Sequence, residues 1–383
     1  MKSHFCTLGA VGDIMLHGAI ADKIGATSDP LYSFRPVLPI LKDCDILFGN
    51  LETMVTLERK AWPGTPNRYF SPIGTGKAMA KAGFKVLNIG HNHSYDWGNE
   101  GVETTVDELK SAGILFGGLQ KKGVSEAQPI IVQCSCGKRF GFLFYCLTYN
   151  TLNTKHGYYA IAPDTGRVKR DIASLSGKAD IIVASVHGGT CMNFWPAPDM
   201  LKGCRVVSDA GADIVLGHHA HVMNGIEKRG HRLICYALPD FVRPFPFGTD
   251  EVTEAMRAPK HESLMVKINI SQQSEITHEA IPLVFDDKLQ TRPALPDEGA
   301  VITSRLEALS RDIASGQSNA KYYAQAQASF KEAYAANLWI AFKRGGIGWL
   351  VQRLMTLRPH HLKILVMGIT HPLPPSLDER GGR

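Results

Sequence analysis

Three histidines stand within four positions in the stretch LGHHAHVMNG at residues 216–225. This stretch follows the apolar run 212–216, so the histidines stand where a strand is expected to end. Residues two apart lie on the same side of an extended chain, so we expect His219 and His221 to point together. His218 would point away from them, free to contact a ligand or the surrounding loop. A His-x-His pair at a strand end is a moderately specific sign of a metal site.

Polar residues also follow other short apolar runs of the chain. The candidate ligands at these ends are Asp13, Glu52, Asn92, His187, His219 and His221. In an open α/β sheet the carboxyl ends of the strands line one crevice, so we expect these side chains to converge. Imidazole, carboxylate and amide donors without a thiolate suit Mn²⁺, Zn²⁺, Fe or Mg²⁺, and this set is large enough for two ions.

Taken singly, each of these residues has a simpler interpretation. His187 could be a hydrogen-bonded histidine, Gly12-Asp13 a turn, and Asn50-Leu-Glu52 a helix cap. Asn92-His93 could be a loop pair with local hydrogen bonds. Their joint occurrence at strand ends favours a metal site. Glycine directly before a polar residue, as in Gly12-Asp13, would let the backbone turn sharply and aim the side chain inward.

Alternating strand and helix patterns must position these residues. The predicted strands are 5–11, 45–48, 85–89, 139–146, 181–186, 214–216, 233–238, 263–270 and 276–283. The predicted helices between them are 100–112, 166–175 and 199–210. Short apolar runs that alternate with amphipathic helices predict an α/β fold.

The composition changes after a proline-containing stretch near residue 290, which predicts a domain at 1–290 and a mainly helical extension at 291–383. Helical spacing there covers 302–313, 321–342 and 347–357, and the last dozen residues look unfolded. Residues 301–383 hold eleven Lys and Arg against five Asp and Glu, which accounts for the net charge of +6. This basic extension could meet a membrane surface or a protein partner, or pack on its own core.

The remaining composition indicates a globular protein of 383 residues, 44% of them hydrophobic. No secretory signal or membrane span is recognisable, so we expect a cytoplasmic protein, peripheral to a membrane at most. The eight cysteines are scattered, and we interpret them as reduced structural thiols, with Cys134-Ser-Cys136 only a weak motif. No base-reading or stacking motif accompanies the basic tail, so no specific nucleic-acid binding is expected.

The order of motifs resembles the CapA-like family of capsule and poly-γ-glutamate synthesis proteins, within the calcineurin-like metallophosphoesterase superfamily. The residues that carry this resemblance are Gly12-Asp-Ile-Met-Leu16, Gly49-Asn-Leu-Glu52, Asn92-His-Ser-Tyr-Asp96 and 211–222. The resemblance spans roughly residues 5–285. It implies a four-layer α/β/β/α sandwich, with two sheets packed face to face, helices outside and a dinuclear metal site at one edge.

By this resemblance two divalent ions would be bound. Asp13, Glu52 and His221 would hold the first ion. Glu52, Asn92, His187 and His219 would hold the second, and Glu52 would bridge them. His93 would be the catalytic proton donor.

This chain departs from the wider pattern at three places. The superfamily usually has a histidine where this chain has Met15, as the CapA-like branch also does, so the first site is short of one ligand. The family often has His-Trp-Gly-x-Glu where this chain has His187-Gly-Gly-Thr-Cys191, and Leu-Gly-Asn-Phe where it has Leu238-Pro-Asp-Phe241. These changes bear on substrate contacts more than on the metals.

Three functions remain open from the sequence. The first is a metal-dependent hydrolase, a phosphoesterase of an anionic small molecule or polymer, with manganese among the candidate ions. The second is a non-hydrolytic accessory protein that holds an anionic polymer such as poly-γ-glutamate during synthesis or export, favoured by the missing ligand and the basic tail. The third is a metal-dependent amide hydrolase, because a cation pair also polarises a carbonyl group.

Overall fold

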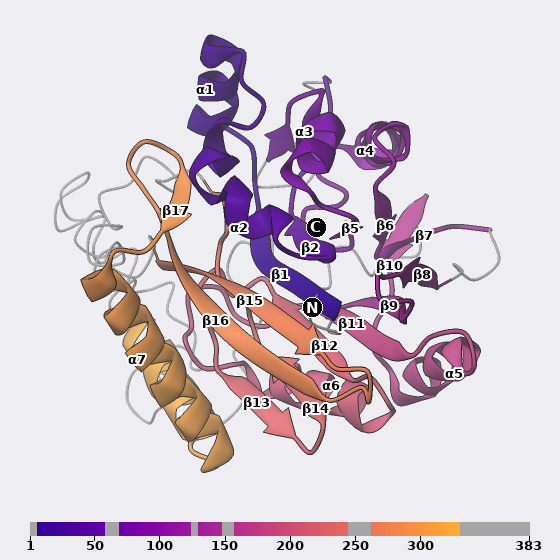
Figure 1. Cartoon of the computed structure of the whole chain (residues 1–383), viewed down its shortest axis with the longest axis vertical. Helices are drawn as coiled ribbons and strands as arrows, with labels where there is room; N and C mark the ends of the chain where they lie inside the picture. Colours follow the sequence, from indigo (N-terminus) through magenta and orange to yellow (C-terminus); the bar gives the residue numbers. More distant parts are fainter. Residues whose placement is uncertain (1–5, 58–68, 124–128, 148–156, 244–261, 330–383) are drawn as a thin grey trace, which may run out of the picture.

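Two mixed β-sheets form the centre of the protein (Figure 1), whose computed structural model describes residues 6–57, 69–123, 129–147, 157–243 and 262–329. In order, the seven-stranded sheet is β17 (Thr291–Pro293), β16 (Ile276–Phe285), β15 (Glu262–Ile270), β1 (Cys6–Ile14), β2 (Ile46–Leu51), β5 (Val86–Asn88) and β6 (Leu115–Gly117). The six-stranded sheet is β13 (Ile226–Arg229), β14 (Arg232–Cys235), β12 (Ile214–His218), β11 (Ile181–His187), β9 (Arg139–Cys146) and β8 (Ile130–Gln133). In each sheet four neighbouring strands run parallel and the outer strands on one or both sides are antiparallel.

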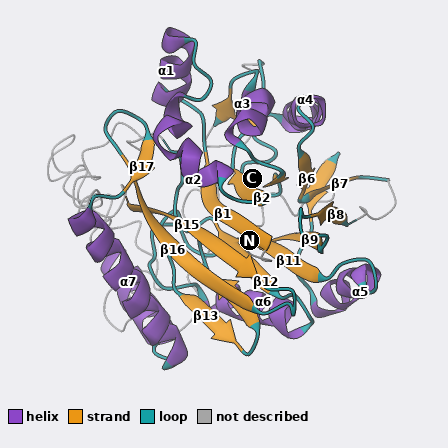
Figure 2. Ribbon diagram, in the orientation of Figure 1, coloured by secondary structure: helices purple, strands orange, loops and turns teal. Residues whose placement is uncertain are grey.

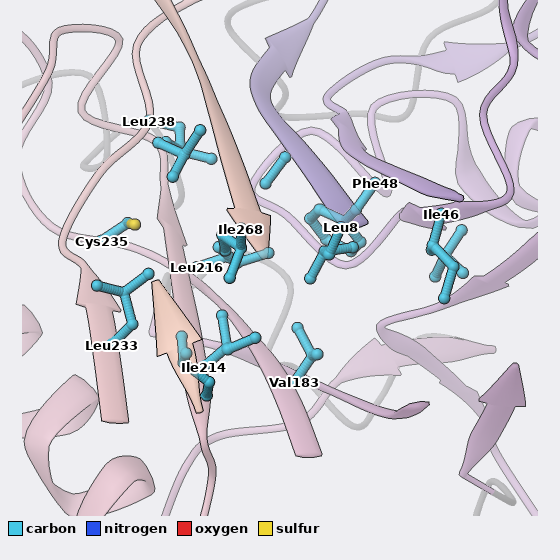
Figure 3. Close-up of a cluster of buried hydrophobic side chains, with 14 of the residues drawn as sticks. Leu8, Ile46, Phe48, Val183, Ile214, Leu216, Leu233, Cys235, Leu238 and Ile268 are labelled. Atoms are coloured by element: carbon cyan, nitrogen blue, oxygen red, sulfur yellow. The ribbon is translucent and has the colours of Figure 1, made fainter. Parts of the chain in front are cut away.

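The two sheets pack against each other through a continuous apolar core (Figure 3). Strand alternation assigns the side chains to this layer: Ile46 and Phe48 of β2 face the second sheet, while Leu47 between them faces the outer helices. On the other sheet Val183 and Ile214 point into the same layer. The rings of Phe48 and Phe142 stack across it, with centroids 6.1 Å apart.

Helices cover the outer face of each sheet. Against the seven-stranded sheet lie α1 (Ala19–Thr27), the 3₁₀ helix η1 (Tyr32–Val37), α2 (Leu38–Lys42), α3 (Thr75–Ala82) and α4 (Gly98–Ser111). Against the six-stranded sheet lie α5 (Thr165–Leu175) and α6 (Pro198–Asp209). Two short ribbons, β3 (Met54–Val55) with β4 (Phe70–Ser71) and β7 (Leu119–Lys121) with β10 (Tyr158–Ala160), complete the described part. The expected four-layer α/β/β/α sandwich is therefore confirmed.

The segment after residue 290 begins inside the sandwich. Strand β17 pairs with β16 at the edge of the seven-stranded sheet. Helix α7 (Pro296–Ala314) lies beside β16 and β13, one strand from each sheet (Figure 2), and its Ile302 and Leu309 join the core between the sheets. Residues 318–329 are helical as well, whereas the rest of the predicted helices 321–342 and 347–357 lies outside the described residues. No helix of the described part has the length and apolar character needed to cross a bilayer.

Gly12 is needed because the chain approaches it closely. A Cβ at this position would lie 1.9 Å from the carbonyl oxygen of Pro239 and 2.7 Å from that of Leu238. Its φ is not in the left-handed region, so the reason differs from the sharp turn that the sequence suggested. The close approach seats the segment after β14 beside Asp13.

Replacing Gly12 with alanine is therefore expected to destabilise the protein by about 1 to 3 kcal/mol, because backbone must shift to admit the methyl group. Urea unfolding of the metal-free protein measures this. Gly25, in α1, is a matched control: nothing lies within 4 Å of a Cβ there, and Gly25→Ala is expected to be neutral or to stabilise by up to about 1 kcal/mol. Equal stability of the Gly12 variant and the wild type would contradict this account.

Candidate metal centre

All six residues that the sequence singled out as ligands lie at one edge of the sandwich. The seven-stranded sheet contributes Asp13 near the end of β1, Glu52 directly after β2 and Asn92 in the loop after β5. The six-stranded sheet contributes His187, the last residue of β11, and His219 and His221 directly after β12. The sequence argument from a single open sheet placed these tips in one crevice. The structure assembles them from two facing sheets instead.

Glu52 occupies the middle of this cluster. Its side chain has no exposed surface, and neither carboxylate oxygen has a hydrogen-bond partner among the described residues. Oε1 lies 3.7 Å from His187 Nε2 and 3.9 Å from His219 Nδ1, and Oε2 lies 3.7 Å from His221 Nδ1. A buried carboxylate left without donors is costly, so this arrangement calls for a positive charge between these groups.

A second group of donors surrounds His221. Its Nδ1 lies 3.1 Å from Asp13 Oδ2 and 2.9 Å from Asp240 Oδ1. Asp240 itself is buried and also meets Arg243 Nη1, 3.2 Å from its Oδ2. Asp240 thus adds a carboxylate to the first predicted site, where Met15 stands in place of the superfamily's usual histidine.

The opposite side of Glu52 is formed by His187 and Asn92. His187 Nε2 lies 2.8 Å from Asn92 Oδ1, and its Nδ1 lies 3.2 Å from Asn50 Nδ2. Asn50 also donates to Asp13 Oδ1 over 2.6 Å and accepts from Asn88 over 2.7 Å. This amide links one predicted ligand of each sheet and fixes their orientation.

His219 and His221 converge through a turn and not through strand alternation. Strand β12 ends at His218, and the φ values of His219 and His221 are 92° and 60°. Positive φ is uncommon for residues other than glycine and is held here by the surrounding structure. The backbone N–H of His219 donates to Asp13 Oδ2 over 3.2 Å, and the two rings lie 5.7 Å apart.

His218 does not reach the opening of the site. It is completely buried, with its Nδ1 3.7 Å from Asp13 Oδ1 and its ring 5.8 Å from that of Phe48. Burial lowers its pKa to about 4, so it is a neutral residue behind Asp13. The expectation that His218 is free to contact a ligand is wrong, because the last residue of the strand faces the layer between the sheets.

His93, the predicted proton donor, lies beside the cluster on the loop after β5. Its Nδ1 lies 2.8 Å from Asp96 Oδ2, and its ring meets Tyr69 edge-on with centroids 4.8 Å apart. Burial raises the pKa of Asp96, although His93 opposes that shift. The contact with Asp96 leaves Nε2 as the ring atom that can face a substrate.

Burial and neighbouring charges shift the pKa values of the cluster away from their ordinary values. Burial lowers the pKa of His187 well below its ordinary value, and His219 lowers it further, so His187 is neutral. Burial also works against a charge on His221, yet the carboxylates around it raise its pKa well above the ordinary value. Burial and the charge of Asp13 raise the pKa of Glu52. An ion would replace protons here, so its binding would release them.

Three residues next to the ligands were not found from the sequence as site residues. Asn50 and Asp240 are described above, and Cys191 places its Sγ 3.4 Å from His219 Nε2. Asn50 belongs to the motif Gly49–Glu52 but was given no role in it. Cys191 and Asp240 lie in segments that depart from the family pattern. Their side-chain types were visible, but no spacing rule brings residues 50, 191 and 240 together.

The donor set fits divalent cations. Protein ligands about 2.1 Å from an ion lie about 3.0 to 3.4 Å from one another. The 3.1 Å between His221 and Asp13 falls in this range, and the 3.7 to 3.9 Å around Glu52 is a few tenths of an ångström longer. Three groups of three described residues here bring their ligand atoms within 4.8 Å of one another: Glu52 with His187 and His219, Asp13 with His221 and Asp240, and Cys191 with His219 and His221. The fold and this cluster define an α/β/β/α protein with a buried carboxylate and histidine centre suited to metal ions.

Comparison with known proteins assigns the family. The model of the family described as bacterial capsule synthesis protein PGA_cap matches residues 7–244. The chain therefore belongs to this family, and the resemblance inferred from its motifs is confirmed. The matched region includes every predicted ligand.

Individual relatives agree with this assignment. The capsule biosynthesis protein CapA of Bacillus anthracis is 31% identical over 245 residues, which cover 62% of this chain and 59% of that protein. The chain thus spans less than two thirds of that relative. The PGA biosynthesis protein CapA of Bacillus subtilis is 28% identical over 284 residues, 71% of this chain and 72% of that protein. A probable polyglutamine synthesis accessory protein of Mycobacterium tuberculosis is 24% identical over 61% of this chain and 65% of that protein.

Solved structures include a distant likeness. The crystal structure of a 5'-nucleotidase from Candida albicans overlaps with a TM-score of 0.41 and 10% sequence identity, over 80% of this chain and 57% of that chain. The layer arrangement described above does not depend on it.

Proposed function

We propose that this chain is a metal-dependent phosphoesterase that acts on an anionic substrate in the synthesis of a capsule or of poly-γ-glutamate. The observation that carries the proposal is Glu52, whose two buried oxygens lack hydrogen-bond donors while three imidazole nitrogens surround them at 3.7 to 3.9 Å. Such a carboxylate is stable only beside positive charge, and a bridging carboxylate serves two ions at once.

The residues divide into two sets around Glu52. Asp13, His221 and Asp240 would hold one ion, and His187, His219 and Asn92 would hold the other, with Glu52 between them. Asp240 supplies the donor that Met15 cannot. The carboxylate, imidazole and amide donors of both sets suit Mn²⁺, Zn²⁺, Fe or Mg²⁺, whereas Cys191, which the sequence did not place here, would favour Zn²⁺ among them if it joined His219 and His221. Elemental analysis decides among these ions.

Divalent cations bound there would lower the pKa of water and neutralise charge that builds on phosphoryl oxygens in the transition state. The chain itself supplies a proton. His93 Nε2 would protonate the oxygen of the departing group, and Asp96 would hold the ring in the tautomer and orientation that this transfer needs. Asn50, which contacts both Asp13 and His187, would hold these side chains from the two sheets in fixed positions relative to each other.

The biological setting of the proposal comes from the relatives. Two of them are named for capsule or PGA biosynthesis and one as a synthesis accessory protein. Anionic polymers and their phosphorylated precursors are the substrate class that matches these names and a cationic centre. The basic segment 301–383 would add attraction for such polymers.

Purified protein loaded separately with Mn²⁺, Zn²⁺, Fe²⁺ or Mg²⁺ is expected to hydrolyse phosphomonoesters or phosphodiesters. Chelation should abolish turnover, and Asn92→Ala should lower it by about 100-fold or more, since even outer partners of metal ligands contribute about 10- to 100-fold. Asn99→Ala provides a matched control: Asn99 lies in α4 and accepts from Tyr95 outside the cluster.

A fully metal-loaded protein that cleaves no phosphoester would refute the catalytic proposal. The same panel includes amide substrates and poly-γ-glutamate.

The second candidate is a non-hydrolytic accessory protein, favoured by the apolar Met15 in a ligand position and by Cys191 in place of the family's acid. Metal-dependent binding of poly-γ-glutamate without turnover would support it.

A further inference from the structure

Three cysteines meet at the end of the sandwich far from the metal centre. Cys6 begins β1, whereas Cys134 and Cys136 lie in the turn between β8 and β9. The Cα atoms of Cys6 and Cys134 are 6.6 Å apart, those of Cys6 and Cys136 are 6.1 Å apart, and the Sγ atoms of Cys134 and Cys136 are 3.6 Å apart. Cys6 Sγ lies within bonding distance of both partners. Because one sulfur forms one disulfide at a time, these two bonds are alternatives.

This cluster is separate from the candidate active site. Asp13 follows Cys6 by seven residues along β1, a span of about 23 Å for an extended strand. The cluster joins the two sheets, since Cys6 belongs to the seven-stranded sheet and the β8–β9 turn belongs to the six-stranded one. None of its members contacts a predicted ligand.

The surroundings of the cluster favour a disulfide over a metal ion. Cys6 and Cys134 are buried in the apolar core between the sheets, where a charged thiolate is costly and a neutral disulfide is not. Asp45, which accepts a hydrogen bond from the Ser135 hydroxyl, adds a negative charge beside the turn that further disfavours thiolates. Both Cα separations fall within the range that a disulfide spans without backbone movement.

We propose that Cys6, Cys134 and Cys136 form an oxidation site that reacts with a disulfide oxidant and then carries one disulfide, which links Cys6 to either partner. Cys136 is exposed and is the entry point, Cys134 is buried, and Cys6 is common to both products. The product is a covalent link between the two sheets that together build the metal centre.

The steps balance without a further reactant. The Cys136 thiolate attacks one sulfur of the oxidant, forming a mixed disulfide and releasing the first thiol. Cys6 then attacks the Cys136 sulfur while its thiol proton passes to the departing group, which releases the second thiol, so the oxidant gains the two electrons. Attack of Cys134 on Cys6 next, with its proton passing to the departing Cys136 sulfur, leaves the buried Cys6–Cys134 bond with no net oxidation.

This proposal corrects the interpretation of the cysteines as reduced thiols that only fill space. The sequence showed a single Cys-x-Cys pair and gave no sign that β1 would bring a third cysteine to it. Disulfides persist chiefly in oxidising compartments, so a stable bond here would argue against the cytoplasmic location expected from the sequence.

The test follows oxidation of the full-length protein by glutathione disulfide, with timed acid quenching, alkylation and peptide mass spectrometry. In the wild type we expect Cys6 in every crosslinked product and one alkylated cysteine among Cys134 and Cys136. Cys136→Ser should slow crosslinking by about tenfold or more and end at Cys6–Cys134, since the buried thiols are poorly accessible. Cys134→Ser should react at the wild-type rate and end at Cys6–Cys136.

Cys44→Ser, at a partly buried free cysteine, is the matched control and should change neither rate nor products. Complete alkylation of Cys6 in the oxidised wild type would overturn the proposal, as would a bound metal ion that protects all three thiols. Equal rates for the Cys136 and Cys134 variants would overturn the entry-point role. Because no activity is measured, failure of the phosphoesterase proposal would leave this result unaffected.

Discussion

Replacing Glu52 with glutamine is expected to abolish tight binding of divalent cations while the metal-free protein stays folded. Glutamine keeps the size and shape of the side chain but removes the charge that two ions would share. In the wild type, a cation at 100 times its dissociation constant should stabilise the folded state by about 2.7 kcal/mol. In the variant this stabilisation should disappear.

The metal-free variant should be at least as stable as the metal-free wild type. Burial and the neighbouring Asp13 raise the pKa of Glu52, so an ionised carboxylate at this position destabilises the folded, metal-free protein. Glutamine removes the charge and offers an amide to the same imidazoles. A residue that destabilises the empty protein and is required for the loaded one is characteristic of a binding site and not of a structural ion pair.

Thermal unfolding with and without added Mn²⁺ or Zn²⁺, together with elemental analysis, measures both effects. Glu103→Gln is the matched control, because that carboxylate is half exposed and contacts only surface groups. Retained metal content and an undiminished thermal shift in the Glu52 variant would exclude Glu52 as the bridging ligand. Strong destabilisation of the metal-free variant would instead indicate a structural role.

The sequence was sufficient for the layers and for the six predicted ligands, which the structure brings to one edge. Each predicted strand overlaps an observed one, and β9 and α5 agree to within one residue at each end. The reason is that buried parallel strands are nearly continuous apolar runs, which few other elements resemble. Helix α1 and strand β13 were not predicted, because only Ile20 of α1 is buried and Ile226 is the one apolar residue of β13.

The parts that escaped prediction depend on contacts between distant segments. Asp240 reaches His221 only because Gly12 lets the segment after β14 approach β1. His219 reaches Glu52 through a positive φ, which no periodicity rule reveals. Cys6 meets Cys136 because the two sheets pack face to face, which sequence spacing does not show. Spacing identifies which strand ends carry polar side chains, whereas tertiary packing decides which of them meet.

Replacing His93 with alanine is expected to lower turnover of alkyl phosphoesters by about 10² to 10⁴, the usual contribution of a general acid, without loss of bound metal. His93 contacts Asp96 and Tyr69 and is not one of the residues proposed to hold an ion, so the metal set is expected to stay intact. Asp96→Asn should have a smaller effect, because it removes the charge that orients the ring and leaves the imidazole itself.

The leaving group distinguishes proton donation from a structural role. An alkoxide must be protonated as it departs, whereas nitrophenolate leaves readily without a proton. His93→Ala should therefore lose much less activity toward nitrophenyl phosphate than toward an alkyl phosphate, while Asn92→Ala should lose similar factors on both. His231→Ala, at an exposed histidine, serves as the control and should match the wild type. Equal losses on the two substrates for the His93 variant would assign His93 to substrate binding, since only the donor of the departing proton has an effect that grows with the basicity of the leaving oxygen.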